Sequence, residues 1–177
     1  MNYRRTSLLA TASVASLLVL IAGCDKKKKG VEPPAELVDL KPTLAVQKLW
    51  DTSVGGGGEK LRLALSLALD RGVLFTAARD GEVVALDPAT GRVKWSQDTK
   101  ADLAAGPGVG ASVVAVGTSD GKVIALDVAS GKVLWQASVS SEVLAAPLVT
   151  GDRVVVRSVD GRVHALDALT GKSQWTG

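Results

Sequence analysis

Cysteine, histidine and aromatic residues are all scarce in this sequence. Its 177 residues include one cysteine, one histidine and six aromatic residues, and the aromatic share is 3%. With Cys24 alone, an intramolecular disulfide and a vicinal cysteine pair are both excluded, so the fold must be held by packing. With His164 alone, a serine triad or a histidine-ligated metal site has almost no residues to draw on. We therefore expect no catalytic residue, no metal ligand and no bound cofactor.

An excess of charge is also lacking in the part of the chain that is expected to fold. Residues 44–177 contain 14 Lys and Arg against 14 Asp and Glu. The net charge of +3 therefore comes from the N-terminal segment, which includes Arg4, Arg5 and the lysine run at residues 26–29. A neutral domain offers no long-range attraction for a polyanion, so nucleic acid is not an expected partner.

The first 43 residues differ in composition from the rest of the chain. Two arginines precede an apolar run over residues 8–21, and Ala22-Gly23 leads into Cys24. This pattern resembles a bacterial lipoprotein signal, which predicts a signal peptide over residues 1–23, lipidation at Cys24 and a membrane anchor made by the lipid. A transmembrane anchor is the alternative, although about 14 apolar residues are few for about 30 Å of hydrocarbon. Residues 24–43 are expected to form a flexible linker.

One seventeen-residue phrase recurs three times at equal spacing, without insertion. It reads RDGEVVALDPATGRVKW from residue 79, SDGKVIALDVASGKVLW from residue 119 and VDGRVHALDALTGKSQW from residue 159. Each copy places Asp-Gly between two apolar, β-branched runs, which predicts a tight hairpin with positive φ at both turn residues. Each copy then has Asp-x-x-Thr/Ser-Gly before its tryptophan, which predicts a second turn closed by the aspartate and by a left-handed glycine.

Four antiparallel strands are expected in each repeat. The two strands that flank the hairpin are predicted at residues 73–77 and 83–86, 113–117 and 123–126, and 154–157 and 163–166. An outer strand follows, with Val93 and Trp95, or Val133 and Trp135, alternating onto one face. The first strand of each repeat is predicted at residues 61–69, 103–109 and 143–149.

Such four-stranded repeats are typical of propeller blades, which close into rings of four to eight. The predicted fold class is therefore all-β, a β-propeller with blades at residues 59–99, 100–139 and 140–177. Residues 44–54 contain a fourth tryptophan, Trp50, and are predicted to be an outer strand that closes the ring. Because one small sheet cannot bury both faces alone, each tryptophan is expected to lie against the turn of the adjacent blade.

Three further features have structural explanations. His164 occupies the place of Val84 and Ile124 in the other repeats, so it is expected to be a packing residue of a strand. Residues 55–58 are four glycines, but they lack the Gly-Lys-Ser/Thr end of a phosphate loop and are predicted to be a loop between blades. The aspartate of each second turn is one lone carboxylate per blade, which serves the turn and not a shared calcium ion.

The repeated phrase resembles the tryptophan-docking motif of the quinoprotein-like β-propellers. The structural residues that this resemblance assigns are Trp50, Trp95, Trp135, Trp175, Gly91, Gly131, Gly171, Asp87, Asp127 and Asp167. The lipoprotein signal, together with the sequence KLWDTSVGGGG from residue 48, is similar to the BamB family of outer-membrane assembly lipoproteins. This likeness implies an eight-bladed, non-catalytic scaffold that binds the periplasmic domains of BamA and other assembly-machine subunits. It also implies that the scaffold helps unfolded outer-membrane proteins reach them.

The same resemblance implies a place on the periplasmic face of the cell outer membrane. Asp25, directly after the lipidated cysteine, leaves retention in the inner membrane open. Because three blades cannot close such a ring, the sequence is expected to be an N-terminal fragment that would aggregate alone through its exposed blade faces. The family's main partner-contacting loops follow the third blade, so partner-binding residues are expected beyond Gly177.

Two other classes of function are left open by the residues. A PQQ-dependent dehydrogenase shares the blade and the tryptophan motif, but it needs a metal site and commonly a vicinal cysteine pair. A periplasmic propeller that senses a ligand or binds the cell wall needs only variable loops on one rim.

Overall fold

A computed structural model describes residues 34–39, 41, 43–56, 58 and 63–177 of the chain. The chain divides into two units, Met1–Ala45 and Val46–Gly177, and every strand found among the described residues lies in the second unit. The predicted signal peptide and Cys24 lie outside the described residues. None of the described residues belongs to a helix of the length and apolarity needed to cross a membrane.

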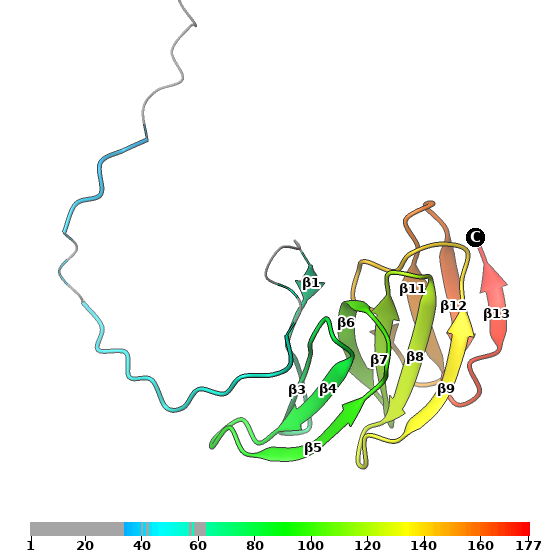
Figure 1. Cartoon of the computed structure of the whole chain (residues 1–177), viewed down its shortest axis with the longest axis horizontal. Coiled ribbons are helices and arrows are strands. Elements are labelled where there is room, and N and C mark those ends of the chain that lie inside the picture. The colour runs from blue at the N-terminus through cyan, green and yellow to red at the C-terminus, as the bar shows by residue number, and fades with distance from the viewer. Residues whose placement is uncertain (1–33, 40, 42, 57, 59–62) are drawn as a thin grey trace, which may run out of the picture. The chain divides into compact units, whose positions relative to one another are not determined.

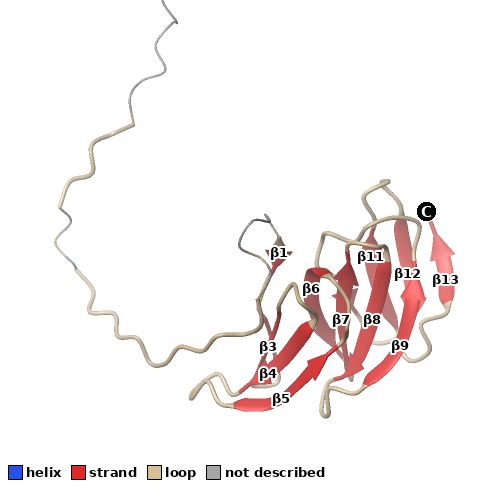
Figure 2. Ribbon diagram, in the orientation of Figure 1, coloured by secondary structure: helices blue, strands red, loops and turns tan. Residues whose placement is uncertain are grey.

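The second unit contains three sheets, each with four antiparallel strands, that stand side by side (Figure 1) and contain nearly all of its regular structure (Figure 2). Blade 1 consists of β2 (Ala68–Asp70), β3 (Val73–Ala77), β4 (Glu82–Leu86) and β5 (Val93–Asp98). Blade 2 consists of β6 (Leu103–Gly110), β7 (Val113–Thr118), β8 (Lys122–Asp127) and β9 (Val133–Ser138). Blade 3 consists of β10 (Leu148–Val149), β11 (Arg153–Arg157), β12 (Val163–Asp167) and β13 (Ser173–Thr176). The predicted β-propeller class is confirmed.

Blade 2 is buried on both faces, which explains its nearly continuous apolar sequence. In β7, Val114 and Val116 pack with blade 1, whereas Val113 and Ala115 pack with blade 3. All six residues of β7 are buried. Successive side chains of a strand point to opposite faces, so a strand between two blades needs apolar residues at every position. The hydrophobic core therefore lies in two seams, one between blades 1 and 2 and the other between blades 2 and 3.

The hairpin between the second and third strands of each blade differs from the predicted turn. Only its glycine has positive φ, which is 104° at Gly81, 77° at Gly121 and 92° at Gly161. The preceding aspartate is not left-handed, and the prediction that both turn residues have positive φ was wrong. In blade 3, the amide of Gly161 donates to the Ser158 carbonyl at 3.0 Å, and the amide of Ser158 donates to the Arg162 carbonyl at 2.9 Å. A left-handed glycine at the end of the turn is sufficient for this longer hairpin.

Each outer strand contains a β-bulge that the alternating pattern did not reveal. Trp95 pairs with Ala85, but Leu86 pairs with Val93, so Lys94 is an extra residue in the outer strand. A bulge changes which side chains share a face. Val93 is 50% exposed as a result, and the prediction that it lies on the same face as Trp95 was wrong. The same shift occurs in the two other blades.

The first strands were predicted correctly only in blade 2, where β6 covers residues 103–110. In blade 3, β10 covers only two residues, because residues 143–147 form a connector in which Val143 is fully buried. In blade 1, the predicted strand is split into β2 and β1 (Ala64–Leu65), and β1 pairs in parallel with β6 of blade 2. Strand alternation alone does not say which neighbouring sheet a segment will join.

Candidate functional site

Three tryptophans each dock on the second turn of the next repeat. We call this Asp-x-x-Thr/Ser-Gly turn a tryptophan seat. The indole N–H of Trp50 donates to the Pro88 carbonyl at 2.9 Å, in the seat of blade 1. Trp95 donates to Val128 at 3.1 Å in the seat of blade 2, and Trp135 donates to Ala168 at 2.9 Å in the seat of blade 3. The acceptor is always the residue that follows the aspartate, so the three seats share one geometry.

The glycine of each seat leaves the space that the indole occupies. A Cβ atom at Gly91 would lie 2.6 Å from Trp50, and one at Gly131 would lie 2.5 Å from Trp95. At Gly171 the distance to Trp135 would be 2.6 Å. These glycines also have φ values of 69–73°, where side chains other than hydrogen are strained. The seat therefore needs glycine for its backbone angle and for the contact with the tryptophan.

The aspartate of each seat closes the turn with its side chain. Asp127 accepts hydrogen bonds from the amide and the hydroxyl of Ser130, at 2.8 and 2.6 Å. Asp87 and Asp167 accept the equivalent bonds from Thr90 and Thr170. Hydrogen bonds from the serine or threonine hydroxyl lower the pKa of all three carboxyl groups below the ordinary value of 3.8. These carboxylates serve the backbone of the turn.

The stability of the chain is expected to fall in acid because protonation weakens the hydrogen bonds that these carboxylates accept. The largest pKa change is at Asp160, where the Ser158 hydroxyl is the main cause and the pKa is lowered to about 2. A lowered pKa in the folded state stabilises the fold above the unfolded value and loses this effect as pH falls through the folded value. The thermal unfolding midpoint, followed by circular dichroism, should be level from about pH 7 to 5 and fall between about pH 4 and 2. Asp160→Asn should reduce that slope, and an unchanged slope would contradict the assignment.

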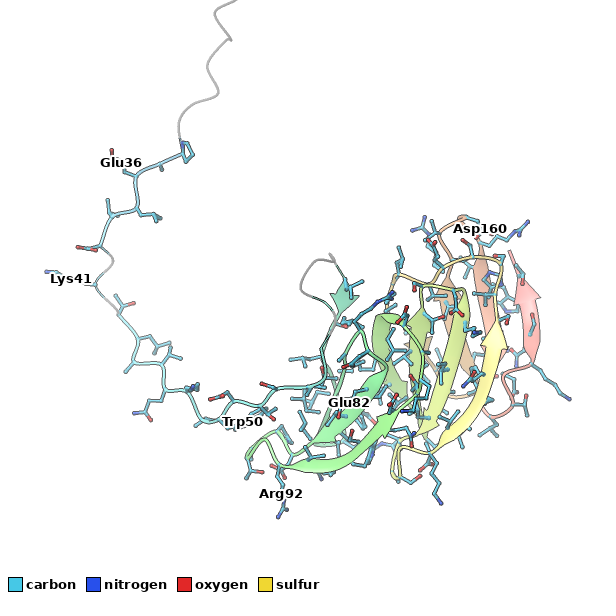
Figure 3. The ribbon with its side chains drawn as sticks, viewed as in Figure 1. Glu36, Lys41, Trp50, Glu82, Arg92 and Asp160 are labelled. Carbon is cyan, nitrogen blue, oxygen red and sulfur yellow. The ribbon has the colours of Figure 1, made fainter. Side chains whose placement is uncertain are left out.

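The two ends of the repeat array differ in how their tryptophans are held. Trp50 precedes blade 1 (labelled in Figure 3), and no strand is assigned anywhere in residues 43–56. The closing strand predicted over residues 44–54 remains a prediction, because a strand forms only beside a partner and no described strand pairs with this segment. Trp175 of β13 is 47% exposed, and its N–H has no acceptor among the described residues. Trp175 is therefore the one docking residue without a seat in the described chain.

His164 is more than the packing residue that its position in the repeat predicted. It is 6% exposed, and its Nε2 lies 3.0 Å from the Ser140 hydroxyl and 3.1 Å from the Ser158 hydroxyl. Its Nδ1 lies 3.2 Å from the Thr176 hydroxyl. No carboxylate contacts the imidazole directly in these bonds, so they do not form a catalytic triad. The bond to Ser140 holds the connector after blade 2 against blade 3, and the bonds to Ser158 and Thr176 lie within blade 3. Ser140, Ser158 and Thr176 are the residues that could have indicated a polar environment for His164, and the sequence analysis did not consider them.

The described residues offer little for chemistry. Among them, no group of three or more His, Cys, Asp or Glu side chains is placed to hold a metal ion. An open hollow of about 320 Å³ is lined by Asp80, Glu82, Ser96 and Asp98 (Glu82 is labelled in Figure 3). Ser96 bonds to Glu82 at 2.7 Å, and Lys100 pairs with Asp98. Asp80 accepts a hydrogen bond from the amide of Gly56 at 2.8 Å, so each lining residue already has a partner.

Blades joined through tryptophan seats define the chain as a quinoprotein-like β-propeller. The sequence matches the family model described as outer membrane protein assembly factor BamB over residues 46–105 and 79–177. The chain therefore belongs to the BamB family.

Similar proteins agree with this assignment. The outer membrane protein assembly factor BamB of Pseudomonas aeruginosa is 41% identical over 105 residues, which are 59% of this chain and 28% of that protein. The crystal structure of BamB from Moraxella catarrhalis is similar with a TM-score of 0.59 and 27% identity, over 71% of this chain and 38% of that one. A quinohemoprotein alcohol dehydrogenase from Pseudomonas putida is similar with a TM-score of 0.54 and 27% identity, over 66% and 21% of the two chains. The chain thus spans less than a third of the length of the curated relative.

Proposed function

We propose that this chain is part of a non-catalytic scaffold that assists the assembly of β-barrel proteins in the outer membrane. The observation that carries the proposal is the match of residues 46–177 to the assembly-factor family, over the same residues that form the seated blades. The proposed partners are the periplasmic domains of BamA, other subunits of the assembly machinery and unfolded outer-membrane proteins.

Stacked blades suit a scaffold because the contacts between blades fix the strands, whereas the loops that connect the strands can vary in sequence. Each seam is closed by a buried apolar cluster and by one indole hydrogen bond. Loops on a rigid support can change without loss of the fold, so they can provide binding surfaces. The outer strands also have free edges, and all four residues of β13 are exposed. An extended segment of a barrel precursor can pair with such an edge by β-addition.

The proposed location is the periplasmic face of the outer membrane. The support is the lipoprotein-like sequence that ends at Cys24, together with a family whose named members are outer-membrane assembly factors. A lipid on Cys24 would hold the chain at the membrane through the linker of residues 24–43. The competing location is the inner membrane, because Asp25 directly follows the lipidated cysteine.

The proposal is tested by purifying the tagged full-length lipoprotein from its own envelope in mild detergent and identifying the proteins that remain bound. We expect recovery of BamA, a large β-barrel with periplasmic repeat domains. The matched control is Cys24→Ser, which should be released from the membrane fraction and should recover much less BamA. Recovery of a bound quinone or metal ion without any β-barrel partner would contradict the scaffold and favour the dehydrogenase.

A further inference from the structure

The two turns of each blade lie at opposite ends of its third strand. In blade 2, for example, β8 begins directly after the Asp-Gly hairpin and ends at the seat. We call the end of the three blades that carries the seats the seat rim, and the opposite end the hairpin rim. Figure 3 shows Trp50 and Arg92 at the lower end of the blades, which is the seat rim, and Asp160 at the upper end. The charges of the two rims can therefore be compared.

The seat rim has cations that no carboxylate neutralises. One cation follows the seat glycine directly in each blade, namely Arg92, Lys132 and Lys172, and Lys94 of blade 1 is a fourth. All four are exposed, and no carboxylate in the described part of the chain lies within ion-pair distance of them. The seat carboxylates instead accept hydrogen bonds from their own turns. The seat rim thus offers unpaired positive charge to a partner.

The cations of the hairpin rim are mostly paired already. The ion pairs there are Arg79–Asp102, Lys100–Asp98, Lys122–Asp120 and Arg162–Asp160. Arg157, at the end of β11, is the exception. Asp80, Glu82 and Glu142 have no cation within ion-pair distance among the residues that the structure describes. The hairpin rim therefore presents unpaired carboxylates, and the two rims differ in the sign of the charge that they leave for a partner.

Exposed aliphatic side chains lie beside the cations of the seat rim. Val93 follows Arg92, and Val133 and Leu134 follow Lys132, and all three aliphatic residues are exposed. Leu169, in the seat of blade 3, is 72% exposed. Cations beside exposed aliphatic groups are typical of protein surfaces that bind a membrane interface, because charge attracts the headgroups and apolar area enters among them.

The segment that follows the lipoprotein signal reaches the blades at the same rim. Trp50 donates to Pro88 in the seat of blade 1, and the amide of Gly56 donates to Asp80 in the hairpin of that blade. The chain from Trp50 to Gly56 therefore runs from the seat rim to the hairpin rim. The residues before Trp50 join the blades at the seat rim, so a tether that begins at Cys24 is attached beside the unpaired cations.

We propose that the seat rim is the membrane-facing surface of this lipoprotein and contacts the anionic headgroups of phospholipids. The inference rests on the proposed lipid anchor at Cys24 and adds which side of the blades the anchor brings to the membrane. Arg92, Lys132 and Lys172 bind lipid phosphates, whereas the carboxylates of the hairpin rim are repelled and face the periplasm. Each cation near an anionic surface is expected to change binding about fivefold.

The test uses the full-length lipoprotein, inserted through its lipid into vesicles of phosphatidylethanolamine and phosphatidylglycerol. A fluorescent label is attached to Ala129→Cys in the seat of blade 2, or to Val159→Cys in the hairpin of blade 3. A lipid on Cys24 blocks that thiol, so the new cysteine alone takes the label. A nitroxide on the lipid headgroups should quench position 129 at least about threefold more than position 159. The difference should shrink in phosphatidylcholine vesicles and at high salt.

Two triple variants separate charge attraction from the effect of the tether. Replacing Arg92, Lys132 and Lys172 together by glutamine should lower the quenching at position 129 toward that at position 159. The matched control replaces Lys100, Lys122 and Arg162 by glutamine, which removes the same number of charges from the hairpin rim, and should leave the quenching at position 129 unchanged. Equal thermal midpoints would show that the fold is intact in both.

The outcomes distinguish the inference from the anchor on which it rests. A lipoprotein that floats with the vesicles but is quenched equally at both positions would overturn the inference, and would make an acidic protein surface the partner of these cations. An equal response to the two triple variants would overturn it as well. In both cases the anchor stands. Failure to float with the vesicles would overturn the anchor itself and the inference with it.

Discussion

Gly131→Ala is expected to undock Trp95 and to lower the free energy of unfolding by about 2–4 kcal/mol. The new Cβ atom would lie 2.5 Å from Cε3 and 2.7 Å from Cδ2 of the Trp95 indole, too close for any contact. The φ value of 73° adds a backbone cost of about 1–2 kcal/mol for a residue with a Cβ atom. Because the indole is held between the seat and its own strand, relief of the clash would break the hydrogen bond to Val128.

The measurement is urea unfolding followed by circular dichroism and tryptophan fluorescence. Gly72→Ala is the matched control, since Gly72 has a φ of 72° but nothing within 4 Å of the place that a Cβ atom would take. The control should lose only the backbone contribution, about 1–2 kcal/mol, and should keep the fluorescence of docked Trp95. If both variants lose the same free energy of unfolding, the contact between Gly131 and Trp95 does not contribute to stability.

Gly108→Ala is expected to have an effect of similar or greater size through a different contact. A Cβ atom on Gly108 would lie 1.8 Å from the carbonyl oxygen of Pro147 and 2.8 Å from its carbon. Both are backbone atoms and cannot turn aside as a side chain can. The first strands of blades 2 and 3 must therefore separate, which opens the seam at Val143. We expect a loss of at least about 3 kcal/mol, or failure to fold.

The control for this second variant is Gly151→Ala. Gly151 lies near the same strands, has no positive φ and has nothing within 4 Å of a Cβ atom. Its substitution should leave the midpoint of urea unfolding unchanged or slightly higher, because alanine restricts the unfolded chain. If Gly108→Ala unfolds at the same urea concentration as this control, the close approach of β6 and β10 is not required for stability.

The second turn of each repeat could be predicted from the sequence because it is decided by residues close together in the chain. Asp127 and Ser130 are three residues apart, and the left-handed Gly131 follows directly. The regular spacing of the three phrases then indicated repeated sheets, and the need of each sheet to cover its faces indicated that they stack. The class of fold followed from these local patterns.

The features that were missed depend on contacts between blades. The bulge at Lys94 changes the face on which Val93 lies, and Trp95 reaches the seat of the next blade, neither of which strand alternation expresses. The segment at Ala64–Leu65 joins β6 of a different sheet. His164 aligned with Val84 and Ile124, but its bond to Ser140 arises only when the connector after blade 2 folds back against blade 3.

The candidate site was only partly predictable for the same reason. The docking residues could be identified as a set, since each repeat shows the same tryptophan, glycine and aspartate. The partner of each tryptophan, and the exposure of Trp175, needed the arrangement of the blades.

The direction of the tryptophan contacts also sets an order of assembly. Trp95 and Trp135 each bind a carbonyl 33 residues later in the chain, and Trp50 binds one 38 residues later. A chain that emerges with its N-terminus first therefore cannot fasten a blade until the next seat has appeared. The blades would be fixed in chain order, because each completed seat binds the tryptophan of the sheet made before it.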